Sequence, residues 1–313
     1  MGKVIRIFFV TDIHGSNLCF RKYLNALKIY NVDVGILLGD LTGKVMVPLI
    51  EKTGRGWETT LMGQQTEANT QDELTKLKNT IEMMGYYWVH QTPDEYRSYK
   101  SDPSLVESLF NKLMLQRLKE WIALADERLL GTPFKVYMAP GNDDRIEVDQ
   151  VIEDSAVIIN CNNKNVMLGD HEMITFSWAN PTPWNTPREK PDEELEPMLE
   201  DLIAKVKDKS NAIFNFHVPP YGFALDLAPE LSRDLVQAAD RKIHVGSKAV
   251  TKMIEKYQPL IGLHGHIHES RGAQKIKRTL IINPGSEYSE GILKGAMIIL
   301  EKGKVKDYVF TSG

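Results

Sequence analysis

Residues 4–15, VIRIFFVTDIHG, open with a nearly continuous apolar run and close in a polar turn. The run over 4–10 is rich in β-branched and aromatic side chains, which is typical of a strand buried on both faces. Ser16 can cap the helix that follows, and a second buried strand over 33–38 then ends at Asp40. This order predicts a β-α-β unit, and therefore an α/β fold that binds its ligands at the carboxyl edge of a sheet.

The composition is that of an ordinary globular protein. Of the 313 residues, 42% are hydrophobic and 26% are charged, which excludes a disordered or fibrous chain. The longest apolar runs are far shorter than the ~20 residues that a helix needs to cross a bilayer. Two cysteines, Cys19 and Cys161, stand in patterns that indicate inert thiols in a reducing compartment. We therefore expect a protein without membrane contact that is located in the cytoplasm.

The charge balance argues against electrostatic binding of nucleic acid. Lysine and arginine number 38 against 42 acidic residues, which gives a formal net charge of −4. Such a chain supplies no field that would hold nucleic acid regardless of its sequence. Basic residues over 275–278 and 302–306 alternate along strand-like segments, and we interpret them as solvated strand faces. No non-specific nucleic-acid binding is expected.

The segment over 45–130 interrupts the strand and helix pattern. Helical periodicity over 70–84 and 103–130 favours a helical insertion, and we expect it to lie over the polar edge of the sheet as a cap. The proline-rich stretch over 180–191 predicts a surface loop. Beyond the insertion, strands are expected over 134–138, 156–159, 166–168, 173–178, 212–216, 260–263, 279–282, 296–300 and 305–310, and helices over 193–207, 229–239 and 250–256.

Several predicted strands end in polar side chains that are expensive to bury. These residues are Asp12, His14, Asp40, Asn142, His217, His264, His266 and His268. A single one is usually a cap or a satisfied hydrogen-bonding group, but the whole set has few structural explanations. Carboxylates, imidazoles and amide oxygens are ligands of divalent manganese, iron and zinc, so the set predicts a metal site. Alternate residues of an extended segment face one side, which lets Asp12 and His14 reach one ion.

The order of these blocks resembles the calcineurin-like metallophosphoesterase superfamily over nearly the whole chain. The blocks are Asp-x-His, Gly-Asp, Gly-Asn-Asp, a His after a strand, and Gly-His-x-His. The resemblance implies a four-layer α/β/β/α sandwich of two mixed sheets, formed by a single domain over 1–313 with the helical insertion over 45–130. It also implies two divalent ions, of manganese, iron or zinc. The implied ligands are Asp12, His14 and His268 for the first ion, Asn142, His217 and His266 for the second, and Asp40 as the bridge. His264 is interpreted as a core residue or a support for the ligands.

Within the superfamily, three segments look like an uncharacterised bacterial and archaeal branch of predicted phosphoesterases. They are residues 217–222, 262–270 and 282–288. The chain departs from most of the superfamily at Asp143, where a histidine is usual. Two cations beside Asp143 would lower the pKa of its carboxyl and make it a poor proton donor. We interpret Asp143 as a residue that orients Asn142 or bound water.

The resemblance implies a phosphoesterase in which a hydroxide that bridges the two metals attacks phosphorus. Phosphodiesters with acidic leaving groups are favoured, because acidic residues leave little positive potential for a dianionic monoester and only Lys44 and Arg145 are nearby candidates for substrate binding. Two alternatives remain open, a non-catalytic metal-binding scaffold and a nuclease, and the acidic balance weighs against the nuclease. The physiological substrate, the oligomeric state and the general acid also remain open, with His90 or His244 as alternative proton donors.

Overall fold

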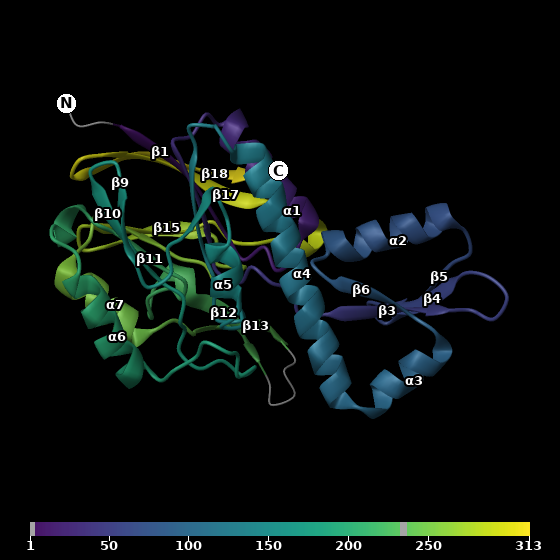
Figure 1. Ribbon diagram of the computed structural model, residues 1–313. Helices are drawn as coiled ribbons and strands as arrows, with labels where there is room; N and C mark the ends of the chain where they lie inside the picture. The colour runs from purple at the N-terminus through teal and green to yellow at the C-terminus, as the bar shows by residue number, and fades with distance from the viewer. Residues whose placement is uncertain (1–3, 232–236) are drawn as a thin grey trace.

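The computed structural model describes residues 4–231 and 237–313 (Figure 1). Two six-stranded sheets form its body. The first contains β1 (Ile5–Thr11), β2 (Val34–Leu38), β7 (Lys135–Ala139), β8 (Ile158–Asn160), β17 (Lys294–Glu301) and β18 (Lys304–Ser312). The second contains β9 (Asn165–Leu168), β10 (His171–Phe176), β11 (Ile213–Phe216), β14 (Ile261–Leu263), β15 (Gly272–Ile276) and β16 (Thr279–Asn283). The strand orders are β18-β17-β1-β2-β7-β8 and β15-β16-β14-β11-β10-β9.

Both sheets are mixed, and the central strands of each run parallel. In the first sheet β1, β2, β7 and β8 are parallel, and in the second β10, β11, β14 and β16 are parallel. Thr11 lies opposite Leu38, and Leu38 lies opposite Ala139. This register places the turns that follow the three strands side by side. The polar ends of the strands therefore meet at one edge of the sheet, as the sequence predicts.

Helices cover the outer face of each sheet. Those on the first sheet are α1 (Asn17–Ile29), α4 (Pro103–Leu129) and α5 (Val148–Glu153), and those on the second are α6 (Asp192–Ala204) and α7 (Lys248–Tyr257). Along β1, Phe8 and Val10 pack against the helices, whereas Ile7 and Phe9 pack between the sheets. Burial on both faces explains the continuous apolar run of this strand. The predicted four-layer α/β/β/α sandwich is confirmed, and the two helical layers lie on opposite sides of the body (Figure 1).

Local signals at α1, α6 and α7 agree with the structure. Ser16 is the N-cap of α1 and accepts a hydrogen bond of 3.3 Å from the Cys19 amide. The predicted helices over 193–207 and 250–256 are present as α6 and α7. Short 3-10 helices, η1 (Lys209–Asn211), η2 (Ala224–Asp226) and η3 (Tyr288–Glu290), complete the connections. Among the described residues, no helix is long and apolar enough to cross a membrane.

The segment over 45–130 contains the two predicted helices, a third helix that the sequence did not predict, and a sheet. Helices α2 (Gln71–Met83), α3 (Pro93–Ser101) and α4 accompany strands β3 (Met46–Glu51), β4 (Trp57–Leu61), β5 (Gln64–Ala68) and β6 (Tyr87–Gln91). The strand order is β5-β4-β3-β6, and the sheet packs on α2 through a small apolar core. The sequence did not predict this sheet, because β4 and β5 are short and largely polar. The insertion projects from the sandwich and α4 joins it to the body (Figure 1).

The insertion contacts the turn after β1. The Ser16 hydroxyl donates to the Met83 carbonyl over 2.6 Å, and the buried Arg117 of α4 donates to the Gly15 carbonyl over 3.0 Å. Gly85 lies so close that a Cβ there would be 2.0 Å from the His14 carbonyl oxygen. The insertion therefore adjoins the Asp12–His14 turn.

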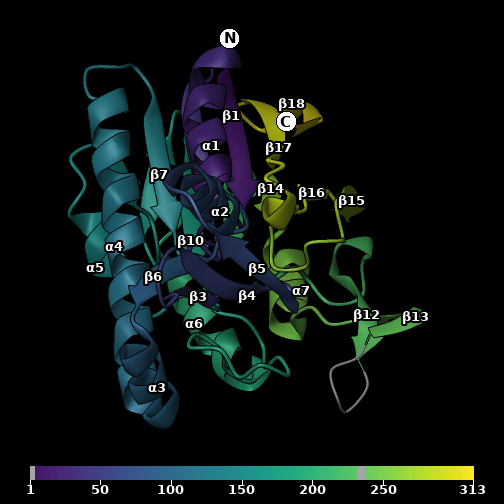
Figure 2. The same ribbon diagram turned by 90° about the vertical axis from the view of Figure 1, so that its right-hand side faces the viewer.

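One predicted helix, over 229–239, is wrong. An antiparallel hairpin occupies this region, formed by β12 (Leu227–Leu231) and β13 (Gln237–His244), and residues 232–236 lie outside the described residues. Pairing of the two strands, with Leu227 opposite His244, overrides the local helical periodicity. The strand β15, of which the sequence indicated only the basic strand-like stretch over 275–278, pairs at the edge of the second sheet with β16. Figure 2 shows the β12–β13 hairpin projecting from the body.

Candidate metal centre

The structure brings together the seven residues that the sequence proposes as metal ligands. They follow the carboxyl ends of parallel strands, and their side chains are Asp12, His14, Asp40, Asn142, His217, His266 and His268. Four of them have positive φ angles: 55° at Asp12, 38° at His14, 21° at Asp40 and 68° at His266. Non-glycine residues adopt this conformation at a cost, and such strain clusters at functional sites.

Two glycines allow the turns to approach one another. A Cβ at Gly39 would lie 2.0 Å from Nδ1 of His217, and a Cβ at Gly141 would lie 2.2 Å from Oδ1 of Asp40. Any side chain at either position would displace one of these polar groups. The Gly-Asp and Gly-Asn pairs of the sequence are therefore a requirement of close packing at the site.

The first ligand group consists of Asp12, His14, Asp40 and His268, whose donor atoms lie within 4.8 Å of one another. Nε2 of His14 and Nε2 of His268 are 3.0 Å apart, and Oδ2 of Asp40 is 3.6 Å from Nε2 of His14. Oδ1 of Asp12 is 3.9 Å from Nε2 of His268. Ligand bonds of about 2.1 Å that meet at a right angle place donor atoms about 3.0 Å apart. The spacing therefore fits four ligands around one ion.

The second group consists of Asp40, Asn142, His217 and His266. Oδ1 of Asn142 is 2.9 Å from Nε2 of His217 and 2.8 Å from Nδ1 of His266. Oδ1 of Asp40 is 3.5 Å from Nε2 of His217. Asp40 thus presents Oδ2 to the first group and Oδ1 to the second, which is the geometry of a bridging carboxylate.

Asp12 leaves one buried oxygen available to a cation. Its Oδ2 accepts hydrogen bonds from the Thr11 hydroxyl, at 2.7 Å, and from the His266 amide, at 3.0 Å. Within residues 4–231 and 237–313, its Oδ1 receives no hydrogen bond, although it is buried. A buried carboxylate oxygen without a donor is costly, and a metal ion would satisfy it. The donor set and this oxygen fit two divalent ions of manganese, iron or zinc.

The electrostatic potential of the cluster also favours cations. Burial alone would lower the pKa of His217, but the negative charges of Asp40 and Asp12 raise it to about 9. Burial would raise the pKa of Asp40, and the charge and hydrogen bond of His217 instead hold it well below its usual value. The carboxylates therefore hold a proton on the buried imidazole of His217, whereas burial lowers the pKa of His14 and lowers that of His266 to about 3.

A hydrogen-bonded chain in the loop over 180–191 orients Asn142. The Asn142 amide nitrogen donates to Oγ1 of Thr186 at 2.8 Å, and the Thr186 hydroxyl donates to Glu189 at 2.5 Å. Glu189 also accepts from the amide and the hydroxyl of Thr182. Because the amide nitrogen is engaged with Thr186, the amide oxygen of Asn142 faces the second ligand group. The sequence predicted only a surface loop here, and the one available signal was the spacing of Thr182, Thr186 and Glu189.

Asp144 connects two of the turns that carry ligands. Its fully buried carboxylate accepts from the amides of Leu41, at 2.8 Å, Thr42, at 2.9 Å, and Gly141, at 2.8 Å. The Thr42 hydroxyl adds a fourth hydrogen bond, at 2.6 Å. Asp144 therefore fixes the turn that carries Asp40 against the turn that carries Asn142. The sequence did not distinguish it from an ordinary acidic neighbour.

Asp143 lies between the two ligand groups and the ammonium group of Lys44. Its carboxylate forms an ion pair with Lys44, its Oδ1 accepts from the Asn142 amide nitrogen at 3.3 Å, and its own amide donates to Asp40 at 3.0 Å. Without ions, burial and then the charge of Asp40 raise the pKa of Asp143 to about 8. The sequence analysis expects a lowered pKa for Asp143, and this lowering would require the positive charge of the bound ions. Arg145, the other expected cation, forms an ion pair with Glu107 of α4.

The remaining histidines of the sequence analysis lie away from the donor atoms. His264 is fully buried, and its Nδ1 lies 2.9 Å from the Phe216 carbonyl, just before His217. His244 pairs with Asp226 at 2.6 Å, and the ring of His90 packs beside Trp88 in the insertion. Across the described ranges, neither His90 nor His244 lines the cavities at the cluster.

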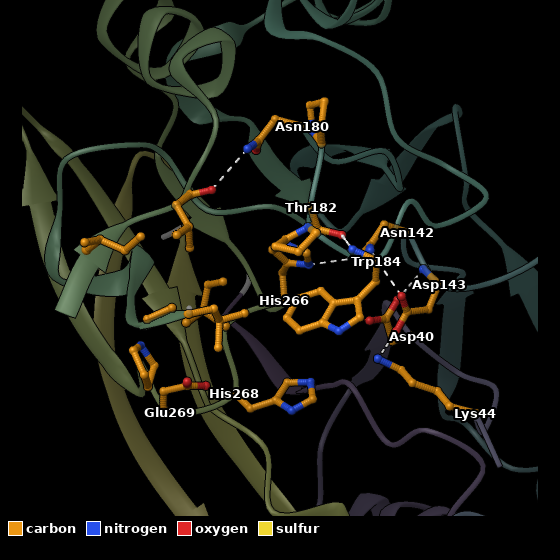
Figure 3. Close-up of a pocket in the computed structure, with 18 residues that line it drawn as sticks. Asp40, Lys44, Asn142, Asp143, Asn180, Thr182, Trp184, His266, His268 and Glu269 are labelled. Carbon is orange, nitrogen blue, oxygen red and sulfur yellow. Dashed lines mark hydrogen bonds and ion pairs between the residues drawn. The ribbon is translucent and has the colours of Figure 1, made fainter. Parts of the chain in front are cut away.

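One cavity opens at the ligand cluster, and a second one lies beside it. The larger one, of about 530 Å³, is lined by Asp40, Asn142, His266 and His268, and by apolar residues of the 180–191 loop and the β12–β13 hairpin (Figure 3). The smaller one, of about 360 Å³, is lined by Arg145, by Phe110 and Met114 of α4, and by the same loop. Both volumes lie in the range of small-molecule sites. Lys44, Asp143 and Trp184 line both cavities.

Comparison with known proteins agrees with this geometry. A family model described as calcineurin-like phosphoesterase matches residues 5–270. The uncharacterised protein MJ1162 of Methanocaldococcus jannaschii is 34% identical over 170 residues, which cover 53% of this chain and 72% of that protein. Two crystal structures match at 14% identity over 99% of both chains, one with a TM-score of 0.60 and the other, TT1561 of Thermus thermophilus, with a TM-score of 0.51. At this identity the two structures are similar in fold alone.

Proposed function

Because the chain belongs to the calcineurin-like phosphoesterase family, we propose that it hydrolyses phosphodiesters with two divalent metal ions bound at the cluster. The observation that carries the proposal is the shared carboxylate of Asp40, which faces both ligand groups. Asp12, His14 and His268 would complete the first site, and Asn142, His217 and His266 the second. Manganese, iron and zinc suit this mixture of imidazole, carboxylate and amide donors.

When bound, two such ions provide activated water and neutralise the charge that develops on the phosphoryl oxygens. The residues of the chain have separate tasks around this chemistry. Thr186 and Asp144 hold Asn142 and Asp40 in position, and Lys44 supplies a positive charge beside Asp143. Hydrolysis transfers a hydroxyl group from water to phosphorus and releases one ester oxygen, which takes the remaining proton, as an alcohol or phenol.

The charges around the larger cavity support diesters over monoesters. Within the part of the chain that the structure describes, Lys44 is its sole lysine or arginine, and Lys44 is already paired with Asp143. Glu269 adds a negative charge at the wall. A monoester dianion would meet less compensating charge than a diester monoanion. Arg145 lines the smaller cavity, where Glu107 pairs with it.

We further propose that the chain is a single domain in which residues 45–130 form a cap beside the site. Phe110 and Met114 of α4 line the smaller cavity, which supports this position of the insertion. A cytoplasmic location is also part of the proposal. It is supported by Cys19 and Cys161, which are both buried and free.

The test combines metal analysis with a comparison of esters. Protein reconstituted with Mn²⁺, Fe²⁺ or Zn²⁺ is expected to hold two ions per chain and to hydrolyse bis(4-nitrophenyl) phosphate faster than 4-nitrophenyl phosphate. Asn142→Ala should lower the activity, whereas His90→Ala, a histidine exchange in the insertion, should leave it unchanged. If the protein binds two ions but hydrolyses neither ester, the proposed enzymatic activity would be wrong and a metal-binding scaffold would be favoured. Faster hydrolysis of the monoester would contradict the diester preference.

A further inference from the structure

The two cavities share a boundary beside the ligand cluster, and among the described residues none of the seven ligand candidates lines the smaller one. Lys44, Asp143 and Trp184 line both, and the larger cavity also contains the metal-ligand candidates Asp40 and His266. Figure 3 shows the Trp184 indole among the side chains of the larger cavity, with His266 and His268 on one side and Asp143 and Lys44 on the other. A phosphate at the cluster would therefore have a separate cavity for each of two substituents.

The larger cavity suits an uncharged apolar group. Its outer wall is formed by Pro181, Ala228, Pro229, Leu231, Ile243 and Val245. Among the described residues that line it, Lys44 is the one lysine or arginine, and it lies at the cluster end in an ion pair with Asp143. Glu269 would repel a second phosphate. These features disfavour a polyphosphate or a nucleic-acid strand and favour an aromatic or aliphatic group.

Trp184 lies on a loop that is fixed in place. The residue is 62% exposed, which is unusual for a large aromatic residue. Its amide donates to the Thr182 hydroxyl at 3.3 Å, and Thr182 in turn donates to Glu189, the residue that holds Thr186 against Asn142. An exposed indole on a pre-organised loop can stack on a ligand without losing much conformational entropy.

We propose that the substrate is a phosphodiester with two organic groups, of which an uncharged apolar or aromatic one occupies the larger cavity against Trp184 and the other occupies the smaller cavity. This inference rests on the proposed phosphodiesterase function and narrows its substrate class. Ile243 and Val245 are then specificity residues of the larger cavity, and Phe110 and Met114 belong to the smaller one. Trp184 forms part of both walls.

The test varies one ester group and keeps the leaving group constant. Methyl, phenyl and 1-naphthyl 4-nitrophenyl phosphates are compared on the metal-loaded protein, and kcat/KM is expected to rise about tenfold from methyl to naphthyl as apolar surface is buried. Trp184→Ala and Ile243→Glu should remove most of this rise in kcat/KM from methyl to naphthyl. Trp184→Phe should retain it. Val309→Glu, on the exposed side of β18, is the control for a new charge and should behave as the wild type.

Binding of diphenylphosphinate, which has no ester bond to break, gives a readout apart from turnover. Calorimetry on the metal-loaded protein should show weaker binding to Trp184→Ala than to Trp184→Phe. Equal kcat/KM for the three esters, or equal phosphinate binding by the two variants, would overturn the assignment of the cavity while leaving the diesterase function intact. Failure to hydrolyse any ester, together with Trp184-dependent phosphinate binding, would overturn the function but support the cavity as an apolar binding site.

Discussion

Replacement of Asp144 by Asn tests whether the arrangement of the metal ligands depends on a residue that touches no ion. The Asp144 carboxylate accepts four hydrogen bonds, two at each oxygen. Asn has the same shape but replaces one oxygen with a donor. Either orientation of the amide therefore removes two hydrogen bonds and places a donor against two donors.

The expected loss of stability follows from these contacts. A hydrogen bond to a charged group contributes about 1.5–3 kcal/mol, so two such bonds amount to about 3–6 kcal/mol. Burial raises the pKa of Asp144, which means that the ionised carboxylate carries a desolvation cost that a neutral amide avoids. We therefore expect Asp144→Asn to lower the free energy of unfolding by about 2–4 kcal/mol. Thr42→Val, which removes one of the four bonds, should lower it by about 1.5–3 kcal/mol.

The assay is urea denaturation of chelator-treated protein, followed by calorimetric titration with Mn²⁺. Asp144→Asn should also weaken metal binding, because Asp144 holds the Asp40 turn against the Asn142 turn. Asp154→Asn exchanges an exposed carboxylate at the end of α5 and serves as the control. A loss below about 1 kcal/mol with unchanged metal affinity would refute the role of Asp144 as the link between the two turns.

Three further outcomes are expected. Asp40→Ala should lose both ions in elemental analysis, because Asp40 faces both ligand groups; retention of one tightly bound ion would contradict the bridge. Thr186→Val should weaken one ion about 10- to 100-fold in calorimetric titration, since the Asn142 amide loses its orienting partner, and Thr186→Ser should restore the affinity. Burial raises the pKa of the Cys161 thiol to about 12 and also raises the pKa of Cys19. Ellman's reagent should therefore label neither thiol until urea unfolds the chain. Rapid labelling of the native protein at neutral pH would show that the thiols are not buried.

The family resemblance implied the four-layer sandwich, whereas the residues themselves predicted the α/β class and the edge at which the ligand candidates lie, both for a common physical reason. Strands buried on both faces leave long apolar runs, and polar residues directly after such runs must lie at the carboxyl edge of a parallel sheet. Asp12 and Asp40 were therefore placed at one edge before their register was known, and the pairing of Thr11 with Leu38 brings their turns side by side. Local pattern was sufficient to place these two residues at one edge because the strand register and the turn chemistry agree.

The walls of the site could not be predicted in the same way. The β12–β13 hairpin gains its stability from cross-strand pairing, and the 180–191 loop from side chains that meet around Glu189. Neither kind of contact produces a periodic pattern of hydrophobic residues. The same holds for β4 and β5 of the insertion, whose polar sequences become strands through pairing with each other. Residues that select the substrate therefore lie in the segments whose sequence was least informative.

Asp143 stands where most members of the superfamily have a histidine. This difference is consistent with the diester proposal when the ion pair of Asp143 with Lys44 is considered. With ions bound, an ionised Asp143 and Lys44 would together carry no net charge, as a neutral histidine would, so the replacement would change the chemistry at this position more than its electrostatic potential. Burial lowers the pKa of Lys44, but the charges of Asp40 and Asp143 outweigh burial and raise it, which makes the ammonium a weak acid. Lys44 can stabilise a departing oxyanion by its charge but cannot readily protonate it. We therefore expect the site to favour esters whose leaving groups need no proton, such as phenolates.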